Sequence, residues 1–331
     1  MSAVTLYSSP EVVDVEGTRS PPASGGATGE EGGELGVGEN SRRPTRGQST
    51  TAQPHRHGEE WRARPPEKAM AWIWMLMAAG AVLLWAVSLG RVLSSSSPAC
   101  LPANSTFLSP PRGDRMSRNV LLVLAHPDDE SMFFAPTILF LKSKGHSIHI
   151  LCLSQGNADG LGNIRKEELY LACVTLKIPA EQVKVLDHSE LQDGFHKNWD
   201  HGLIAELTLA QSQLWNIDTI VTFDSQGVSG HPNHCDVHHG ICKLLRDNGQ
   251  GHIEAWELVS LNIFRKYSGP VDIWLSSTLS SSSKQPTYTL VNNSPSRSFE
   301  AMASHKSQWV WFRRLFVLFS SYTYINVLQK I

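Results

Sequence analysis

A run of 22 consecutive residues without a charged side chain, from Ala69 to Gly90, constrains the fold of this chain more than any other feature. A helix of that length rises about 33 Å, enough to cross the roughly 30 Å hydrocarbon core of a bilayer. Lys68 and Arg91 bracket the run, and its three tryptophans suit the interfaces between membrane and water. The run therefore predicts a single transmembrane helix over residues 69–91.

Two alternatives compete with a membrane-spanning helix. A buried core helix is disfavoured because the run is apolar on every side and low-complexity sequence flanks it. A cleaved signal peptide would suit a chain that starts at Met70. Against it, the apolar run is long for a signal and has almost no basic residues directly before it.

Residues 1–68 differ in composition from the rest of the chain. They contain no Phe, Ile or Cys and are rich in Gly, Pro, Ser, Glu and Arg. Such a segment buries too little apolar surface to offset the entropy of ordering it, so we expect a disordered extension. Either the natural chain begins at Met70, or these residues form a regulatory tail, for which we find no motif.

Charge and cysteine content narrow the partners and the compartment. A net charge of −2 gives no case for binding nucleic acid, since proteins that do so are usually basic. The five cysteines are an odd number without paired spacing. Arginines follow the apolar run, so a chain starting at Met70 would keep its C-terminal part in the cytosol. Sequons at Asn104 and Asn292 would be usable only on the luminal side.

Residues 92–117 have the Ser- and Pro-rich composition of a linker, and residues 118–331 are long enough to form one core. The apolar run at 119–124 is typical of a parallel strand buried on both faces. We also predict strands at 146–153, 183–186, 218–223 and 258–264, helices at 133–144, 164–177, 203–215 and 233–245, and a loop at 276–284. This alternation predicts an α/β, Rossmann-like fold, with a mostly parallel sheet covered by helices on both faces. No GxGxxG follows the first strand, so a dinucleotide fingerprint is absent.

Two polar clusters follow predicted strands, where ligands bind in open α/β sheets. Ala125–Glu130 comes directly after the first strand, and Asp224–His234 comes after the strand at 218–223. In the first cluster, one of two adjacent aspartates can bind a metal while the other faces a water. In the second, His231 and His234 lie on one face of a predicted helix.

These residue types suit hydrolysis by a single metal ion. Catalytic zinc takes three protein ligands and leaves a fourth position for water, whose pKa it lowers towards 7. A carboxylate can then act as general base, and a nearby histidine can stabilise the oxyanion or protonate the leaving amine.

Other interpretations of the clusters remain open. A lone His-x-x-His is seldom a metal site, and two adjacent aspartates can also cap a helix or bind magnesium for phosphate chemistry. Two clusters at strand ends together favour metal-dependent hydrolysis. We assign the other candidate histidines to the surface or the core: His188, His196, His201, His238 and His239.

The residues of Ala125–Glu130 and Gly230–His234 resemble the LmbE-type zinc-dependent de-N-acetylase family. Further segments are similar to a eukaryotic branch that acts on a glycolipid precursor of glycosylphosphatidylinositol (GPI) anchors: residues 132–137, 221–224, 227–231, 265–267 and 311–315. The resemblance covers residues 70–331 and does not extend to residues 1–69.

The resemblance implies roles for individual residues. Three side chains match the protein ligands of a divalent metal, zinc in this family: His126, Asp129 and His234. Asp128 matches the general base, and His231 matches the histidine that stabilises the tetrahedral intermediate and assists departure of the amine. Arg165 matches an arginine that contacts substrate; the alternative is a solvated charge on a helix.

The resemblance also implies a substrate, N-acetylglucosaminyl-phosphatidylinositol, hydrolysed to acetate and glucosaminyl-phosphatidylinositol in the second step of GPI-anchor synthesis. This reaction takes place at the membrane of the endoplasmic reticulum. The expected partners are therefore this glycolipid and the bilayer, and no protein partner is indicated. Two alternatives are a de-N-acetylase of a soluble amino sugar and a membrane-tethered binding protein without turnover.

The segment Trp309–Phe319 is dense in aromatic residues and contains two adjacent arginines. It is too short and too interrupted by charge to span a bilayer. As a helix it would either lie at the membrane interface, with its arginines at headgroup level, or pack on the sheet as ordinary core.

Overall fold

The computed structural model describes residues 67–94, 98–101, 117–194, 197–248, 253–282 and 285–331. Residues 1–66, most of the expected linker, Asn104 and His196 lie outside the described residues. Helix α1 (Glu67–Leu93) covers the apolar run. Within the described residues it is the one helix long and apolar enough to cross a membrane, and most of its side chains are exposed.

The globular part contains an eight-stranded sheet among the described residues, in the order β1-β7-β8-β6-β5-β2-β3-β4. Five neighbouring strands are parallel: β6 (Glu254–Leu258), β5 (Thr219–Phe223), β2 (Asn119–Leu124), β3 (Ser147–Cys152) and β4 (Val183–Val185). Three pair antiparallel at one side: β8 (Ile325–Lys330), β7 (Thr287–Val291) and β1 (Ala99–Leu101). The predicted α/β fold is thus confirmed, with a mixed sheet.

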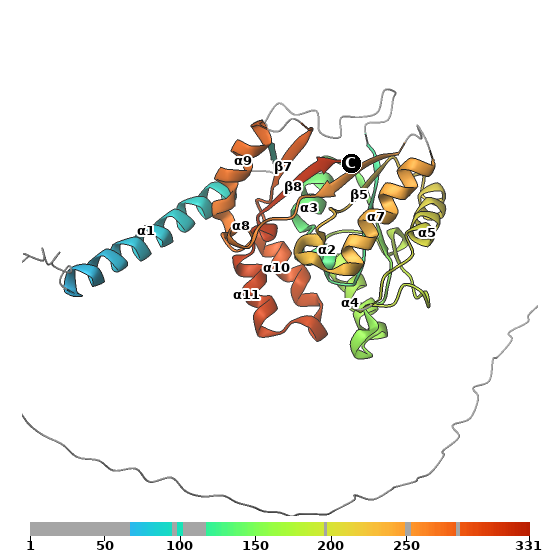
Figure 1. Ribbon diagram of the computed structural model, residues 1–331, viewed down its shortest axis with the longest axis horizontal. Helices are drawn as coiled ribbons and strands as arrows, with labels where there is room; N and C mark the ends of the chain where they lie inside the picture. The colour runs from blue at the N-terminus through green and yellow to red at the C-terminus, as the bar shows by residue number, and fades with distance from the viewer. Residues whose placement is uncertain (1–66, 95–97, 102–116, 195–196, 249–252, 283–284) are drawn as a thin grey trace, which may run out of the picture. The chain divides into compact units, whose positions relative to one another are not determined.

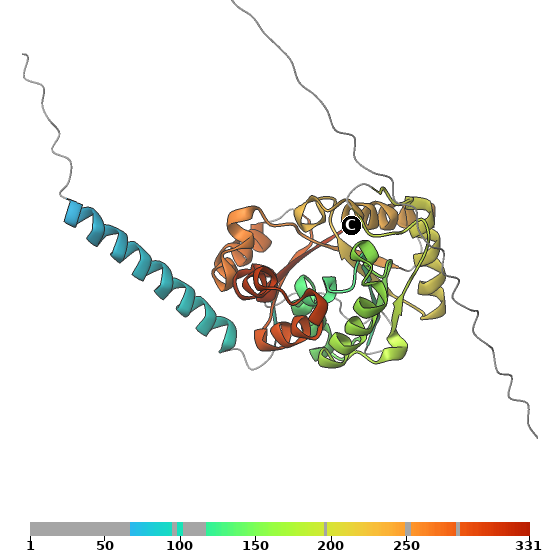
Figure 2. The same ribbon diagram turned by 90° about the horizontal axis from the view of Figure 1, so that it is seen from below.

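Helices cover both faces of the sheet (Figures 1 and 2). Alternate residues of β2 point to opposite faces, as the two-residue repeat of a strand requires. Leu122 packs in one core cluster with α3 (Ala135–Ser143) and α4 (Gly162–Thr175). Val123 packs in the other with α5 (His201–Leu214) and α7 (Pro232–Asp247). Each core is therefore closed by amphipathic helices.

The remaining helices are α2 (Asp129–Met132), α6 (Gly227–Gly230), α8 (Ile263–Lys266), α9 (Asp272–Ser282), α10 (Pro295–Ser304) and α11 (Trp311–Phe319). Single 3₁₀ turns are η1 (Asn157–Asp159), η2 (Ala180–Gln182), η3 (Gly269–Val271), η4 (Lys306–Gln308) and η5 (Ser321–Thr323). Figure 1 shows α10 and α11 together at one end of the globular part, separated from α5 and α7.

Two predicted elements are wrong. The strand expected at 258–264 ends at Leu258, and α8 begins soon after because the Asn262 side chain accepts a hydrogen bond from the Arg265 N–H. The serine-rich loop expected at 276–284 is largely the helix α9. Its Ser277 and Thr278 hydroxyls donate to the carbonyl of Trp274, so the polar side chains bond within the helix.

The expected linker also contributes to the sheet. Ala99–Leu101 forms β1, which pairs with Thr289–Val291 at the edge. A segment of only three residues is too short for its sequence to predict a strand. Its extended conformation is determined by the pairing with β7. The boundary of the globular part therefore begins before residue 118.

The strand order brings the two polar clusters together. From β2 the chain continues to β3 and β4 on one side, and then crosses to β5 on the other side of β2. At such a switch point the loops after the two central strands separate and leave a crevice. The segments following β2 and β5 both open into this crevice.

Candidate active site

Three predicted ligand side chains converge at the ends of β2 and β5. His234 Nε2 lies 3.3 Å from His126 Nδ1 and 3.3 Å from Asp129 Oδ1. His126 Nδ1 lies 3.9 Å from Asp129 Oδ2. All three side chains are buried. The structure thus brings together donors that are up to 108 residues apart in the chain.

These spacings fit a single tetrahedral metal ion. With metal–ligand distances near 2.1 Å, neighbouring ligands of a tetrahedral site are about 3.4 Å apart. The two separations from His234 Nε2 match this value, whereas His126 Nδ1 lies 3.9 Å from the other oxygen of Asp129, so a metal held by all three would require a shift of the carboxylate or the ring. The ring nitrogens of His126, His231 and His234 also lie within 4.8 Å of one another, so this cluster could hold a metal ion.

The second nitrogen of each ligand histidine is engaged, which determines the tautomer. His234 Nδ1 lies 3.2 Å from the carbonyl of Gly227 and must donate to it, leaving Nε2 with a free lone pair. His126 Nε2 lies 3.0 Å from Asp193 Oδ1 and 3.2 Å from Asn233 Oδ1, which leaves Nδ1 free. Such outer partners orient histidine ligands and raise their basicity.

The position of His234 depends on the aromatic ring of Phe223 and on the absence of a side chain at Gly227. Its imidazole stacks on Phe223 at the end of β5, with ring centroids 4.0 Å apart. Gly227 has a φ of +52°, and a Cβ there would lie 2.8 Å from Cβ of His234. Any larger residue would push the helix that carries His234 away from the site.

Asp128 sits in a strained turn. Its φ of +120° is rare for any residue with a side chain, so the surroundings must maintain it. Its N–H donates to Glu130 Oε2 at 3.1 Å. Its carboxylate lies 3.4 Å from the Arg165 guanidinium and also contacts the Arg313 guanidinium of α11. These contacts hold the carboxylate of Asp128 between two cationic side chains.

A fully buried ion pair supports this turn. His305 Nε2 lies 2.7 Å from Glu130 Oε1, and neither side chain is exposed. Burial disfavours the charged imidazole, but the nearby Glu130 carboxylate outweighs it and raises the pKa of His305. Because Glu130 also bonds the backbone of Asp128, the pair links the segment after α10 to the turn after β2.

His231 lies beside the ligands rather than among the closest three. Its ring centroid is 4.9 Å from that of His126 and 4.7 Å from that of His234. Burial and the neighbouring His234 and His126 rings lower the pKa of His231 to about 4. Its imidazole is therefore neutral near pH 7 and keeps one N–H to donate.

The charges of the cluster favour deprotonated acids. Burial opposes ionisation of Asp129, but His234 and His126 outweigh it and hold the pKa of Asp129 below its usual range. Burial opposes a charged His126, but the hydrogen bond to Asp193 and the charge of Asp129 raise the pKa of His126. The carboxylates of Asp129 and Asp193 are therefore anionic at neutral pH. Binding of a metal ion by Asp129 requires this charged form.

Arg165 is buried, so the alternative of a solvated helix charge is wrong. Its guanidinium donates to the carbonyls of Pro127, at 2.9 Å, and Gly156, at 2.8 Å. A Cβ at Gly156, whose φ is +67°, would lie only 2.5 Å from the guanidinium carbon. In the structure Arg165 holds the Asp128 turn, and its contact with substrate stays a prediction.

The sequence interpretation missed three residues of the site. Asp193 follows β4, so its position after a strand end could have identified it. His305 carried no such signal, and Arg313 lies in the segment 311–315 that supports the resemblance but had been given no role; both lie more than 170 residues from the turn they contact.

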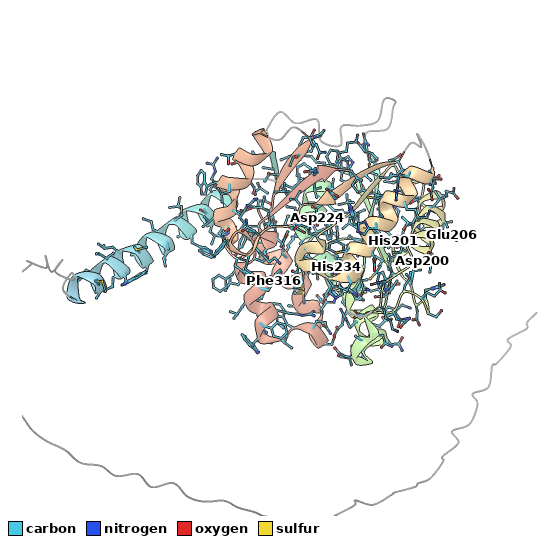
Figure 3. The ribbon with its side chains drawn as sticks, in the orientation of Figure 1. Asp200, His201, Glu206, Asp224, His234 and Phe316 are labelled. Atoms are coloured by element: carbon cyan, nitrogen blue, oxygen red, sulfur yellow. The ribbon has the colours of Figure 1, made fainter. Side chains whose placement is uncertain are left out.

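We had assigned the remaining candidate histidines to the surface or the core. Those that lie among the described residues are indeed outside the ligand cluster. His238 contacts the carbonyl of Phe223 and the carboxylate of Glu257, and His201 contacts Asp236. In Figure 3, His201 lies towards α5 and Phe316 towards α11, with His234 between them.

Comparison with known proteins gives consistent results. A family described as GlcNAc-PI de-N-acetylase matches residues 121–245. A probable N-acetylglucosaminyl-phosphatidylinositol de-N-acetylase of Schizosaccharomyces pombe is 41% identical over 64% of this chain and 86% of its own length. The N-acetylglucosaminyl-phosphatidylinositol de-N-acetylase of Bos taurus is 37% identical over 77% of this chain and 97% of its own length.

Among solved structures, an N,N'-diacetylchitobiose deacetylase from Pyrococcus horikoshii superposes with a TM-score of 0.44. It is 13% identical and covers 65% of this chain and 84% of that one.

A pair of glycine substitutions tests the packing of Arg165. Gly156 and Gly160 both have positive φ, but a Cβ at Gly160 meets no atom within 4 Å. We expect Gly160→Ala to cost about 1–2 kcal/mol of stability from backbone strain alone. Gly156→Ala should cost clearly more, because it also displaces a buried cation. Thermal unfolding of both variants measures the difference, and equal losses would show that Arg165 relocates freely.

Proposed function

The chain belongs to the N-acetylglucosaminyl-phosphatidylinositol de-N-acetylase family, and we propose that it removes the acetyl group from N-acetylglucosaminyl-phosphatidylinositol. Its relatives are deacetylases by name, so an amide hydrolase is the coarse expectation for this chain. The products would be acetate and glucosaminyl-phosphatidylinositol, the second step of GPI-anchor synthesis.

One observation carries the proposal: the donor atoms of His126, Asp129 and His234 converge, with His234 Nε2 spaced from the other two as in a tetrahedral metal site. We propose zinc as the metal, since two histidines and one carboxylate are ligands that it prefers. When bound, the metal would polarise the amide carbonyl and lower the pKa of a water.

Side chains of the protein would then transfer the proton of the attacking water. Asp128, which contacts Arg165 and Arg313, would accept the proton of the attacking water. Attack converts the amide carbon to a tetrahedral centre and places negative charge on its oxygen. The neutral His231 can donate its N–H to that oxygen, a stabilisation that needs no charged imidazole.

Breakdown of the tetrahedral centre breaks the C–N bond, and the amine nitrogen must gain a proton as it leaves. The proton taken up by Asp128 is the one available for this transfer, and the N–H of His231 would assist departure of the amine. Return of the proton to nitrogen regenerates the Asp128 carboxylate and gives acetic acid and the amine, which at neutral pH leave as acetate and the ammonium form, so atoms and charge balance. Arg165 would orient Asp128, and we retain a substrate contact for it as a proposal.

A membrane location follows from the lipid of the substrate. We propose that α1 anchors the chain in the endoplasmic reticulum membrane as a single pass and that the catalytic domain faces the cytosol. The exposed apolar length of α1 supports an anchor. A substrate that keeps its acyl chains in the bilayer favours the glycolipid over a soluble amino sugar.

The first prediction concerns the reaction. The full chain in detergent micelles should release acetate from N-acetylglucosaminyl-phosphatidylinositol much faster than from free N-acetylglucosamine. A chelator should abolish release, and added zinc should restore it, because three ligands hold the metal reversibly. Equal rates on both substrates would favour the soluble amino-sugar alternative, and no acetate from either would contradict an enzyme.

A second prediction separates ligands from base. His126→Ala, Asp129→Ala and His234→Ala should each lose bound metal and activity together. Asp128→Asn should keep the metal and lower turnover by about 10²–10⁴-fold, the usual contribution of a general base. Metal analysis beside kinetics checks both. If Asp128→Asn loses the metal while Asp129→Asn keeps it, the two carboxylates have exchanged roles.

The third prediction concerns the side of the membrane. Asn292 is buried and donates to Ser298 and Thr323, so the folded domain cannot present it for glycosylation. Asp187 and Ser189 are both exposed in the segment after β4, and Asp187→Asn creates a sequon with Ser189. In cells neither this variant nor Asn104 should gain a glycan, as judged by gel mobility with and without endoglycosidase. A glycan at either position would place the domain in the lumen.

A further inference from the structure

An apolar groove of about 390 Å³ runs from the catalytic crevice along α11. Its walls come from α11, from Tyr267 after α8 and from the segment at α2: Met132, Phe133, Ser229, Tyr267, Phe312, Arg313, Leu315, Phe316 and Phe319. Hydrolysis of an acetamide by the residues described above needs none of the rings in this groove. Its size and composition therefore call for a separate explanation.

The inner end of the groove shares its residues with the active site. The Phe133 ring lies 5.9 Å from the ring of His234 and 5.8 Å from that of Phe316, centroid to centroid. Arg313, which lines the groove, contacts the carboxylate of Asp128. A molecule lying in the groove would thus have one end next to the reacting groups.

Two cations stand at this inner end. Arg313 is one, and Lys266 is the other, since its ammonium donates to the Ser229 hydroxyl that lines the groove, at 2.6 Å. Farther out the lining is aromatic and aliphatic. The groove therefore changes from cationic to apolar along its length, which matches an amphiphile with an anionic group between a polar head and a hydrocarbon tail.

The outer end opens on side chains that water solvates poorly. Trp311 is 72% exposed and Phe264, on α8, is 86% exposed, while Leu315 and Phe319 are about half exposed. An exposed apolar patch of this kind marks contact with protein or membrane. The C-terminal segment is therefore not ordinary core, which the sequence had left open.

The membrane helix reaches the same place. Trp85 Nε1 and the Phe319 carbonyl both approach Gly269, whose Cβ position lies 3.0 Å from the former and 3.4 Å from the latter. Trp274 Nε1 donates to the Ser88 hydroxyl at 3.0 Å, which ties α9 to α1. The outer end of the groove is thus continuous with the last turns of the helix that would leave the bilayer.

From this arrangement we propose that the groove along α11 holds the hydrocarbon chains of a membrane glycolipid, whose phosphodiester lies near Arg313 and Lys266 while its amino sugar reaches Asp128. The inference rests on the proposed function and names how the substrate is bound. Each acyl chain can pass from the bilayer beside α1 into the groove without crossing water, so the lipid is only partly withdrawn from the membrane.

Kinetics on two substrates test the proposal with the full chain in detergent micelles. One substrate is the diacyl glycolipid, and the other is the same N-acetylglucosaminyl-inositol phosphate headgroup without acyl chains. Phe312→Ser and Leu315→Ser should each lower kcat/KM for the glycolipid by about tenfold, the loss expected for one apolar contact. For the chain-free headgroup, kcat/KM should change by less than about twofold.

A control is Leu214→Ser, which removes an even more exposed leucine at the end of α5 and should change neither rate. Equal losses on both substrates, or no loss on the glycolipid, would overturn the acyl groove. If the unaltered protein hydrolyses neither substrate, the proposed function has failed. A binding measurement then still tests whether the groove holds acyl chains.

That measurement uses the full chain in phosphatidylcholine vesicles that contain phosphatidylinositol with a photoreactive acyl chain. Cross-links should map to residues 311–319, and excess unlabelled phosphatidylinositol should reduce them strongly. Labelling that the excess does not reduce would mean general contact with the bilayer and would overturn a binding groove. Absence of labelling with self-association of the chain would assign the groove to a second copy, which also overturns it.

Discussion

The buried carboxylate of Asp129 joins the two halves of the site. It accepts the backbone N–H groups of Ala125 and His126, at 3.1 and 2.8 Å, and faces His234 from the far side of the crevice. Removing such a charge from water is costly unless it is paired and hydrogen-bonded. These contacts offset that cost, and a divalent cation at the same position would add to them.

The C-terminal part of the chain completes a site that the parallel strands begin. β7 and β8 extend the sheet antiparallel beyond β6, and this extension places α10 and α11 over the turn after β2. His305 then reaches Glu130, and Arg313 reaches Asp128. The strained backbone of Asp128 is thus held from the opposite end of the chain, beside the turn that carries Asp129.

The same C-terminal segments lie between the crevice that holds the ligand cluster and the apolar helix α1. α11 presents Phe312 and Leu315 to the groove, while Leu318 lines a second hollow together with Trp85 and Leu89 of α1. One short helix therefore lies between the catalytic crevice and the apolar anchor. A cationic inner end and an apolar outer end are what a substrate with a polar head and a lipid tail requires from such a position.

Local sequence patterns were sufficient for the α/β fold, the apolar helix and the meeting of the two polar clusters: buried strands have continuous apolar runs, and polar residues directly after parallel strands meet at one edge. The same logic could have found Asp193 after β4. The ligand set His126, Asp129 and His234 came from the resemblance to the LmbE-type family. Local patterns misassigned α9, because its hydroxyl groups bond to their own helix, and they did not reveal β1, whose short strand exists only through pairing with β7.

Only the tertiary structure decided how the site is supported and where it opens. Glu130 and His305, or Asp128 and Arg313, are 175 and 185 residues apart, and nothing in a single sequence couples positions at such separations. Which nitrogen of each histidine is free depends on the carbonyl of Gly227 and the carboxylate of Asp193, both contributed by other segments. The aromatic segment at 309–319 was compatible with core or membrane by composition, and the packing of α11 on its neighbours left most of its rings exposed.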